Sequence, residues 1–295
     1  MNLILDGSNL LHRAHWVNKS RGKDSSADDI YIFLNALKSY AKMFNTKDIY
    51  IAWDKKLKYP CTNFRQEATE CDYKGTRDKE SAKDVFKCEE ELSEITTSLG
   101  VKNIYPGIME ADDVIGWLTE RLEGPNVIVS ADKDLLQLVN ENNSVYAPRK
   151  KLLIDNKNFE EEIGMNIDIF LPYKAIFGDK SDNIQGIQGC GKVRAKKLAE
   201  QYINDHESLS KEHLDIIKKN LELMCLYSGW RKAGDEEEKI YNDQFNISIN
   251  IEPDLDKFKE YCEQYGFKSY IKKFKDWENT FKGSRLLALL NNFTV

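Results

Sequence analysis

The chain has 295 residues, with 43 basic and 49 acidic side chains and a formal net charge of -6. Because 41% of the residues are hydrophobic and 11% aromatic, it can build a core, which excludes disorder of the whole chain. The 31% charged fraction excludes a membrane protein, since no apolar run approaches the ~18–20 residues that a span needs. Without the basic segment of a signal peptide, and with scattered cysteines that suggest reduced thiols, we expect a cytoplasmic protein.

Strands and helices alternate over the first 180 residues. The apolar segments predict strands at 2–5, 48–53, 101–105 and 126–129, helices at 28–44 and 111–122, and a short helix ending at Val139. The residues after the first strand, DGSN, are typical of a polar turn. The segment 55–100 is charged and has helical periodicity near its end. This alternation predicts a mainly parallel central sheet with helices on both faces.

The composition changes after about residue 177. Four glycines fall within fourteen residues, at Gly178, Gly186, Gly189 and Gly191, and a basic helix is predicted after them. The remainder has a helical pattern, interrupted by a polar insertion at 228–244. Its DEEE run at 235–238 predicts a solvent-exposed loop. The segment 268–282 predicts an amphipathic helix that packs on the core.

Acidic side chains follow several predicted strands, at the edge where open parallel sheets bind ligands. Nine acids have positions from which the fold can bring them together: Asp6, Asp54, Glu110, Asp112, Asp113, Asp132, Asp134, Asp179 and Asp182. Each one alone is explained by a helix cap or a turn. Together they would repel one another without cations, and hard oxygen ligands suit Mg²⁺ or Mn²⁺. A wide acidic site favours two metal ions that act on a phosphodiester.

Two basic segments accompany these acids. Residues 55–87 hold nine Lys or Arg against six acids, and the pairs Phe64-Arg65 and Tyr73-Lys74 place an aromatic ring beside a cation. A solvated charged face is the usual explanation, but such pairs also suit single-stranded nucleic acid. The second segment, 186–198, is a glycine-rich turn before a helix that carries four cations. Backbone N–H groups at such a helix start bind phosphate without reading sequence.

The motifs DGSN, AWD, FRxE with YKGxR, EADD, SADKD and GDKSDNIQGIQGCGK resemble, in matching order, those of the flap endonuclease / 5′-nuclease family. The chain is most similar to stand-alone bacteriophage 5′-3′ exonucleases and to the N-terminal nuclease domain of bacterial DNA polymerase I. The resemblance covers about residues 1–200. It implies an α/β, PIN-like nuclease core over 1–180, with a helical arch inserted at 55–100. It also implies a helical DNA-binding region over 181–295, with a helix–turn–helix at 186–200.

The resemblance also implies roles for individual residues. The first metal ion would be held by Asp6, Asp54, Glu110, Asp112 and Asp113, and the second by Asp132, Asp134, Asp179 and Asp182. The catalytic cations would be Lys74, Arg77 and Arg13. DNA would be bound by Tyr73, Arg65, Gly189, Gly191, Lys192, Arg194, Lys196 and Lys197, and related proteins bind K⁺ at this glycine turn. His12 and His15 receive no role.

The implied function is that of a structure-specific 5′-nuclease, a 5′-3′ exonuclease and flap endonuclease of DNA replication and repair. The resemblance implies a monomer in a bacterial or phage-infected cell that cleaves branched DNA with a 5′ single strand, and RNA primers. Two alternatives stay open. A ribonuclease with an acidic site would not need the duplex-binding glycine turn. A non-catalytic binder of branched DNA would gain only repulsion of phosphate from nine acids.

Overall fold

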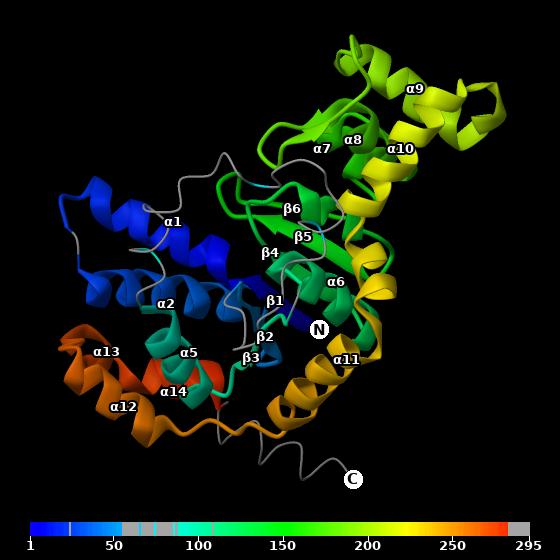
Figure 1. Cartoon of the computed structure of the whole chain (residues 1–295). Coiled ribbons are helices and arrows are strands. Elements are labelled where there is room, and N and C mark those ends of the chain that lie inside the picture. Colours follow the sequence, from blue (N-terminus) through cyan, green and yellow to red (C-terminus); the bar gives the residue numbers. More distant parts are fainter. Residues whose placement is uncertain are drawn as a thin grey trace.

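The computed structural model describes residues 1–23, 25–54, 65, 74, 85, 88–107 and 109–282, except for the side chains at 227–234 and 236. Its centre is a six-stranded sheet in the order β3-β2-β1-β4-β5-β6 (Figure 1). The strands are β1 (Asn2–Asp6), β2 (Ile49–Ala52), β3 (Lys102–Ile104), β4 (Asn126–Val129), β5 (Asn143–Ala147) and β6 (Leu152–Ile154). All neighbouring strands are parallel except β5 and β6. The predicted mainly parallel sheet is confirmed, and its last two strands were not predicted.

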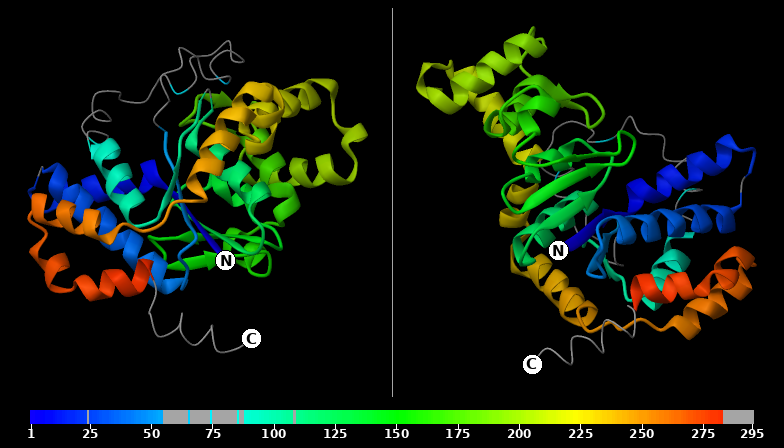
Figure 2. Two further views of the ribbon diagram at one scale, coloured as in Figure 1. Left: turned by 90° about the horizontal axis from the view of Figure 1, so that it is seen from below. Right: turned by 180° about the vertical axis from the view of Figure 1, so that it is seen from behind.

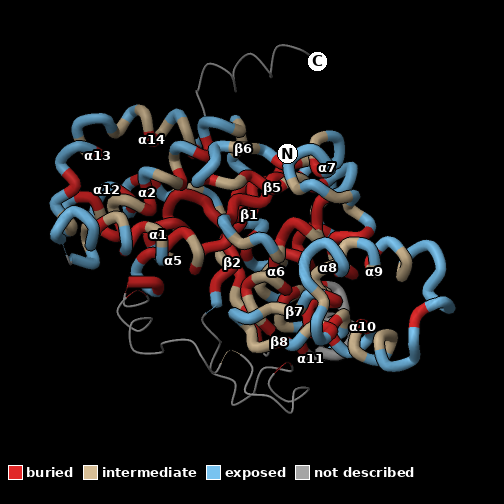
Figure 3. The backbone as a smooth tube through the Cα atoms, turned by 90° about the horizontal axis from the view of Figure 1, so that it is seen from above, coloured by how far each residue is buried: buried red, intermediate tan, exposed pale blue. Residues whose placement is uncertain are grey.

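Helices cover both faces of this sheet, because side chains of a strand point alternately to opposite faces. Leu3 and Leu5 pack on one face, together with α1 (Gly7–Ser20), α2 (Ser26–Met43), α5 (Glu89–Ser98), α12 (Leu255–Gln264), α13 (Lys268–Lys272) and α14 (Phe274–Phe281). Ile4 packs on the other face, with the 3₁₀ helix η2 (Asp134–Leu138), α6 (Ala111–Arg121) and α11 (Leu226–Ser248). The strands are therefore the buried centre of the molecule (Figure 3).

Helix α1 begins directly at the end of β1, where the sequence predicts only a turn. Asp6 is the N-cap of this helix, and its Oδ1 accepts a hydrogen bond from the Asn9 backbone N at 2.9 Å. Gly7 lies so close to β2 that a Cβ there would be 2.5 Å from Cγ2 of Ile51. The DGSN motif is thus a helix start pressed against the sheet, and it fixes the Asp6 carboxylate at the sheet edge.

A separate hydrophobic cluster joins the helices that surround the glycine-rich turn. This part comprises α8 (Ile167–Phe177), the hairpin β7 (Gly178–Asp179) and β8 (Ile184–Gln185), α9 (Lys192–Asn204), η3 (His206–Ser208) and α10 (Lys211–Met224), after the short α7 (Phe159–Ile163). A Cβ at Gly186 would be 2.4 Å from the carbonyl oxygen of Ile176. Only glycine therefore fits where the chain passes the end of α8. Helices α9 and α10 lie at the opposite end of the molecule from α12–α14 (Figure 2).

The C-terminal helices return to the sheet. Helix α11 spans the predicted polar insertion without interruption, and Glu237 in it is only 2% exposed. The prediction of an exposed DEEE loop was therefore wrong. The predicted amphipathic segment forms α13 and α14, and it buries Trp277 and Phe281 beside α2, as expected. The boundary expected at residue 180 stays a prediction. No described helix is both long and apolar enough to span a membrane.

Candidate metal and nucleic-acid site

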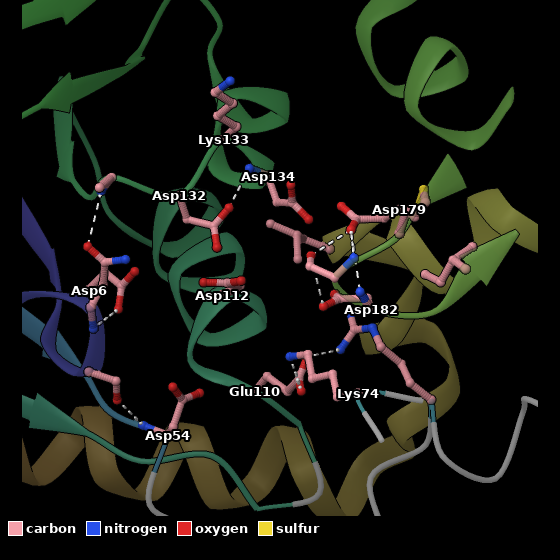
Figure 4. A pocket seen from close by; sticks show the side chains of 18 of the residues that line it. Asp6, Asp54, Lys74, Glu110, Asp112, Asp132, Lys133, Asp134, Asp179 and Asp182 are labelled. Carbon is pink, nitrogen blue, oxygen red and sulfur yellow. Dashed lines mark hydrogen bonds and ion pairs between the residues drawn. The ribbon is translucent and has the colours of Figure 1, made fainter. Parts of the chain in front are cut away.

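Acidic side chains from distant parts of the chain line one pocket of about 580 Å³ beyond the carboxyl ends of the strands (Figure 4). All of the nine predicted acids except Asp113 line it: Asp6, Asp54, Glu110, Asp112, Asp132, Asp134, Asp179 and Asp182. Strand β1 supplies the first of them, the ends of β2 and β4 the next, and the start of α6 and the β7–β8 hairpin the rest. The sheet edge therefore gathers them as the sequence analysis expects.

Backbone and hydroxyl groups hold these carboxylates in place. The Ser130 hydroxyl donates to Oδ2 of Asp6 at 2.7 Å, and the Asp54 carboxylate accepts from the Ala111 backbone N at 3.0 Å. The hairpin is ordered by Asp179, whose Oδ1 accepts from the Ser181 backbone N and hydroxyl at 2.8 and 2.6 Å. Asp6 and Asp54 are thus oriented by groups from neighbouring elements, and Asp179 by its own hairpin.

Asp113 is completely buried and does not line the pocket. Both of its carboxylate oxygens accept from the Arg65 guanidinium at 2.6 Å, and one also accepts from the Glu110 backbone N at 3.1 Å. This placement differs from the role predicted for it as a metal ligand. Asp113 instead positions its neighbour Glu110, with which it forms a capping box.

Arg65 is the partner of Asp113 and lines the pocket, and its predicted contact with DNA stays a prediction. Its side chain is only 3% exposed. Besides Asp113 it reaches Oε2 of Glu110 at 3.3 Å and the carbonyl oxygen of Leu223 at 2.8 Å. The sequence marks Arg65 as one cation in a basic run, and only the fold reveals that it links α6 to α10.

Two lysines contact the acids inside the pocket. Nζ of Lys74 lies 2.6 Å from Oε1 of Glu110, in agreement with its predicted place at the site. Lys174, on α8, was not predicted. It forms an ion pair with Asp134 and lies 3.5 Å from Oδ2 of Asp179. The sequence feature that could have indicated Lys174 is its position, one helical turn before the GD of the GDKSDN motif.

Three other predicted residues are not placed in the pocket. Arg13 does not line it, and its guanidinium donates to the Tyr40 hydroxyl at 3.2 Å. Tyr73 and Arg77 lie outside the described residues, so their predicted roles stay predictions.

The clustered acids strongly perturb one another. Burial, followed by the charge of Asp54, raises the pKa of Asp6 to about 7. Removal from water and the charge of Asp132 raise the pKa of Asp112 well above its ordinary value. Burial also raises the pKa of Asp134, even though Lys174 acts in the opposite direction. Positive charge placed among these carboxylates would therefore stabilise their ionised forms.

The acids line the pocket without closing on one point. Among the described residues, no three Asp, Glu, His or Cys side chains are gathered closely enough to hold a metal ion as they stand. Several acids instead pair with Lys74, Lys174 and Arg65. The donor set itself, carboxylate oxygens without a thiolate, has the chemistry that Mg²⁺ and Mn²⁺ prefer.

An aromatic and basic strip leads away from the pocket along α1. His12 is exposed and lines the pocket, and its Nε2 accepts from the Trp16 indole N at 3.3 Å. Trp16 is 49% exposed, with Nζ of Lys19 at 5.4 Å from its ring centroid. Spacings of four and three residues put these side chains on one helix face. The sequence analysis assigned none of them a role, because the helix itself was not predicted.

The glycine-rich turn precedes α9, as predicted. Gly191 is the N-cap of this helix, and Gly189 has a φ of +68°, which favours glycine. The cations Lys192, Arg194 and Lys197 are exposed. Lys196 differs, because its Nζ donates to the carbonyl oxygen of Gly164 at 2.8 Å.

Comparison with known proteins agrees with this site. Residues 1–164 match the family model of the 5′-3′ exonuclease N-terminal resolvase-like domain. The 5′-3′ exonucleases of Mycoplasmopsis pulmonis and Aquifex aeolicus are each 30% identical, over 92% of this chain and 93% of theirs. DNA polymerase I of Lactococcus lactis is 30% identical over 92% of this chain and 32% of its own length. A crystal structure of bacteriophage T5 D15 protein with metal ions has a TM-score of 0.69 at 21% identity, covering 84% of this chain and 100% of that one. The family predicted from the motifs is confirmed: this chain belongs to the 5′-3′ exonuclease family.

Proposed function

We propose that the chain is a structure-specific 5′-nuclease that hydrolyses phosphodiester bonds in DNA with a 5′ single strand, using two divalent metal ions, Mg²⁺ or Mn²⁺. The observation that carries the proposal is the convergence of eight carboxylates, from five separated segments, on one pocket that also holds lysines. A binding protein would gain only repulsion of phosphate from these acids.

We assign the acids to two metal ions as the family resemblance implies. Asp6, Asp54, Glu110 and Asp112 would hold one metal ion, and Asp132, Asp134, Asp179 and Asp182 the other. Asp113 is left out because Arg65 occupies both of its oxygens. Two such ions, when bound, polarise the scissile phosphate and lower the pKa of an attacking water molecule.

Two lysines supply positive charge to these carboxylates: Lys74 lines the pocket, and Lys174 forms an ion pair with the lining residue Asp134. The Lys74 side chain is 23% exposed, so its ammonium can approach a phosphate while remaining partly shielded from water. A fixed cation beside developing negative charge stabilises the transition state more than the ground state. We assign this role to Lys74. Lys74 also pairs with Glu110, which keeps its ammonium directed into the pocket in the absence of DNA.

Two surfaces that extend beyond the acidic side chains support a DNA substrate. The strip of His12, Trp16 and Lys19 on α1 offers aromatic stacking and positive charge to an unpaired strand. The glycine turn and the cations that follow it offer backbone N–H groups and charge to a duplex. Together they suit a junction between single-stranded and duplex DNA.

Finer features of the proposal rest on the family resemblance and, for the cytoplasmic location, on the sequence composition. These are the use of RNA–DNA primers, a K⁺ ion at the glycine turn, the monomeric state and a place in the cytoplasm. A change in duplex affinity when Na⁺ replaces K⁺ at constant ionic strength would support the K⁺ site.

A panel of labelled substrates tests the proposed specificity. A 5′-flap DNA duplex, a matched blunt duplex and single-stranded RNA are incubated with the protein and Mg²⁺. We expect cleavage near the flap junction and slower cleavage of the other two. Cleavage of RNA alone would favour the ribonuclease alternative, and tight flap binding without cleavage would favour the binding protein.

A further inference from the structure

We propose that two side chains of α11, Glu237 and Gln244, act as positioning residues for the acidic pocket. They hold the loop that precedes α6, and this loop in turn positions Glu110 and Asp112 in the pocket. We call Glu237 and Gln244 the α11 clamp. The inference rests on the proposed function, because it assigns the clamp to metal-ligand geometry. Glu237 belongs to the run for which the sequence predicts an exposed loop, and its burial has no role in the mechanism above.

The clamp holds the backbone directly after β3. The Gly107 backbone N donates to Oε1 of Glu237 at 2.9 Å. The Gln244 side-chain amide pairs with both backbone groups of Tyr105, accepting from its N and donating to its O at 2.8 Å each. Residues 237 and 244 are seven apart, so they lie on the same face of α11. Two side chains that lie two helical turns apart on α11 therefore hold Tyr105 and Gly107 of the loop.

Glu237 and Gly107 lie in close contact. A Cβ on this residue would lie 2.2 Å from Oε2 of Glu237. The carboxylate thus sits directly against the backbone, and its bond to Gly107 is charge-assisted, which makes it stronger than a bond between neutral groups. Burying a carboxylate costs free energy that an apolar side chain would not. The bond to Gly107 is one of the interactions that offset this cost.

The loop leads straight to the metal ligands. Gly107 is three residues before Glu110, the N-cap of α6, and Asp112 lies in the first turn of that helix. The same helix face of α11 also grips α6, since Tyr241 packs edge to face on Trp117 at 5.6 Å between ring centroids. Figure 1 shows α11 running beside α6 after leaving α10. Helix α11 thereby contacts both the loop and α6.

Substitutions at Glu237 test this assignment. Glu237→Gln keeps an oxygen that accepts from Gly107, Glu237→Met removes it, and Glu238→Gln is the matched control. Glu238 is the next residue of the helix, but it is 52% exposed and pairs with Arg121 on the surface. Thermal unfolding followed by circular dichroism reports whether each variant folds.

The decisive readout is Mn²⁺ binding to the DNA-free protein, measured by isothermal titration calorimetry. Side chains that orient metal ligands affect metal affinity by roughly 10–100-fold when they are lost, so we expect Glu237→Met to bind Mn²⁺ at least ~10-fold more weakly. Glu237→Gln and Glu238→Gln should stay within about twofold of the wild type, well below that range. In flap cleavage, Glu237→Met should require more Mg²⁺ and lose kcat while keeping KM for DNA.

Folded Glu237→Met protein with wild-type Mn²⁺ affinity would overturn the proposal, and so would equal losses in the Gln and Met variants. If Glu237→Met does not fold, Gln244→Ala decides in its place: weaker Mn²⁺ binding supports the clamp, and unchanged binding overturns it. A wild-type protein that binds Mn²⁺ but cleaves no flap would overturn the proposed function, and the binding comparison would still test the clamp.

Discussion

Asp6 combines a structural and a chemical task in a single side chain. One carboxylate oxygen caps α1 and the other accepts from Ser130, while the group faces the other acids of the pocket. Burial, followed by the charge of Asp54, raises its pKa from 3.8 to about 7. Between these values the folded chain retains a proton that the unfolded chain has released. The free energy of unfolding of the metal-free protein should therefore fall as pH rises through this window.

The size of this effect is on the order of a few kcal/mol, because one pKa unit corresponds to about 1.4 kcal/mol. Thermal unfolding in EDTA across the window measures it. Asp6→Asn keeps the cap, removes the charge, and should flatten the dependence while raising stability at the alkaline end. Asp28→Asn, at the start of α2 beside Lys23, is the control and should change neither. A wild-type protein that gains stability with rising pH would contradict this description.

Lys74 provides a second test at this scale. Lys74→Ala should lower kcat for flap cleavage roughly 100-fold, with little change in KM, because its charge acts on the transition state. Lys133→Ala is a matched control, since Lys133 lines the pocket but points away from its centre (Figure 4). Steady-state kinetics under saturating Mg²⁺ measures both. Equal losses of kcat in the two variants would exclude a specific role for Lys74.

At the scale of elements, the cations of α9 differ in their contacts: Lys197 is exposed, whereas the Lys196 ammonium is hydrogen-bonded to the backbone. Lys197→Ala should lower the slope of log affinity against log salt for duplex DNA by about 0.9, the value for one phosphate contact. Lys196→Ala should lower it less, because its ammonium already contacts the Gly164 carbonyl. Fluorescence anisotropy over a salt series measures both slopes. The reverse order would mean that Lys196 leaves Gly164 to bind phosphate.

The elements also show what the sequence can predict. The strands β1, β2 and β4 were predicted because each is a short, buried, mainly apolar run, and β3 because the apolar Val101, Ile104 and Tyr105 flank its polar residues. Strand β5 was missed because it starts with polar Asn143 and Ser144. Helix α1 was missed because DGSN has the composition of a turn, and the decisive contact, Gly7 against Ile51, joins residues far apart in sequence. Helix α11 was missed because a charged run gives no sign that Gly107 provides a partner for Glu237.

Across the whole molecule, the last helices complete the core of the nuclease. Trp277, in α14, is fully buried and packs on Phe258 and Tyr270. Trp277→Ala should therefore lower the free energy of unfolding by about 3–5 kcal/mol. Trp16→Ala is the same substitution at an exposed site and should leave stability nearly unchanged, while weakening binding of single-stranded DNA. Urea denaturation measures both stabilities. Equal effects would contradict the packing described here.

The pocket was predictable as a set of acids, since the carboxyl ends of parallel strands must meet at one edge. Its internal pairings were not. The burial of Asp113 by Arg65 and the bridging of two acids by Lys174 depend on how α6, α8 and α10 dock, which no local pattern encodes. The sequence thus predicts which residues gather, and the fold decides which of them remain available to metal and substrate.

Whether the acidic pocket is a two-metal nuclease site is decided by cleavage of a 5′-labelled flap duplex in Mg²⁺, in Mn²⁺ and in EDTA. Asp112→Asn is the inactive reference and Glu238→Gln the active one. The proposed two-metal site predicts cutting near the junction with either metal, none in EDTA, and none by Asp112→Asn. Undiminished cleavage in EDTA, or by folded Asp112→Asn protein, would contradict it.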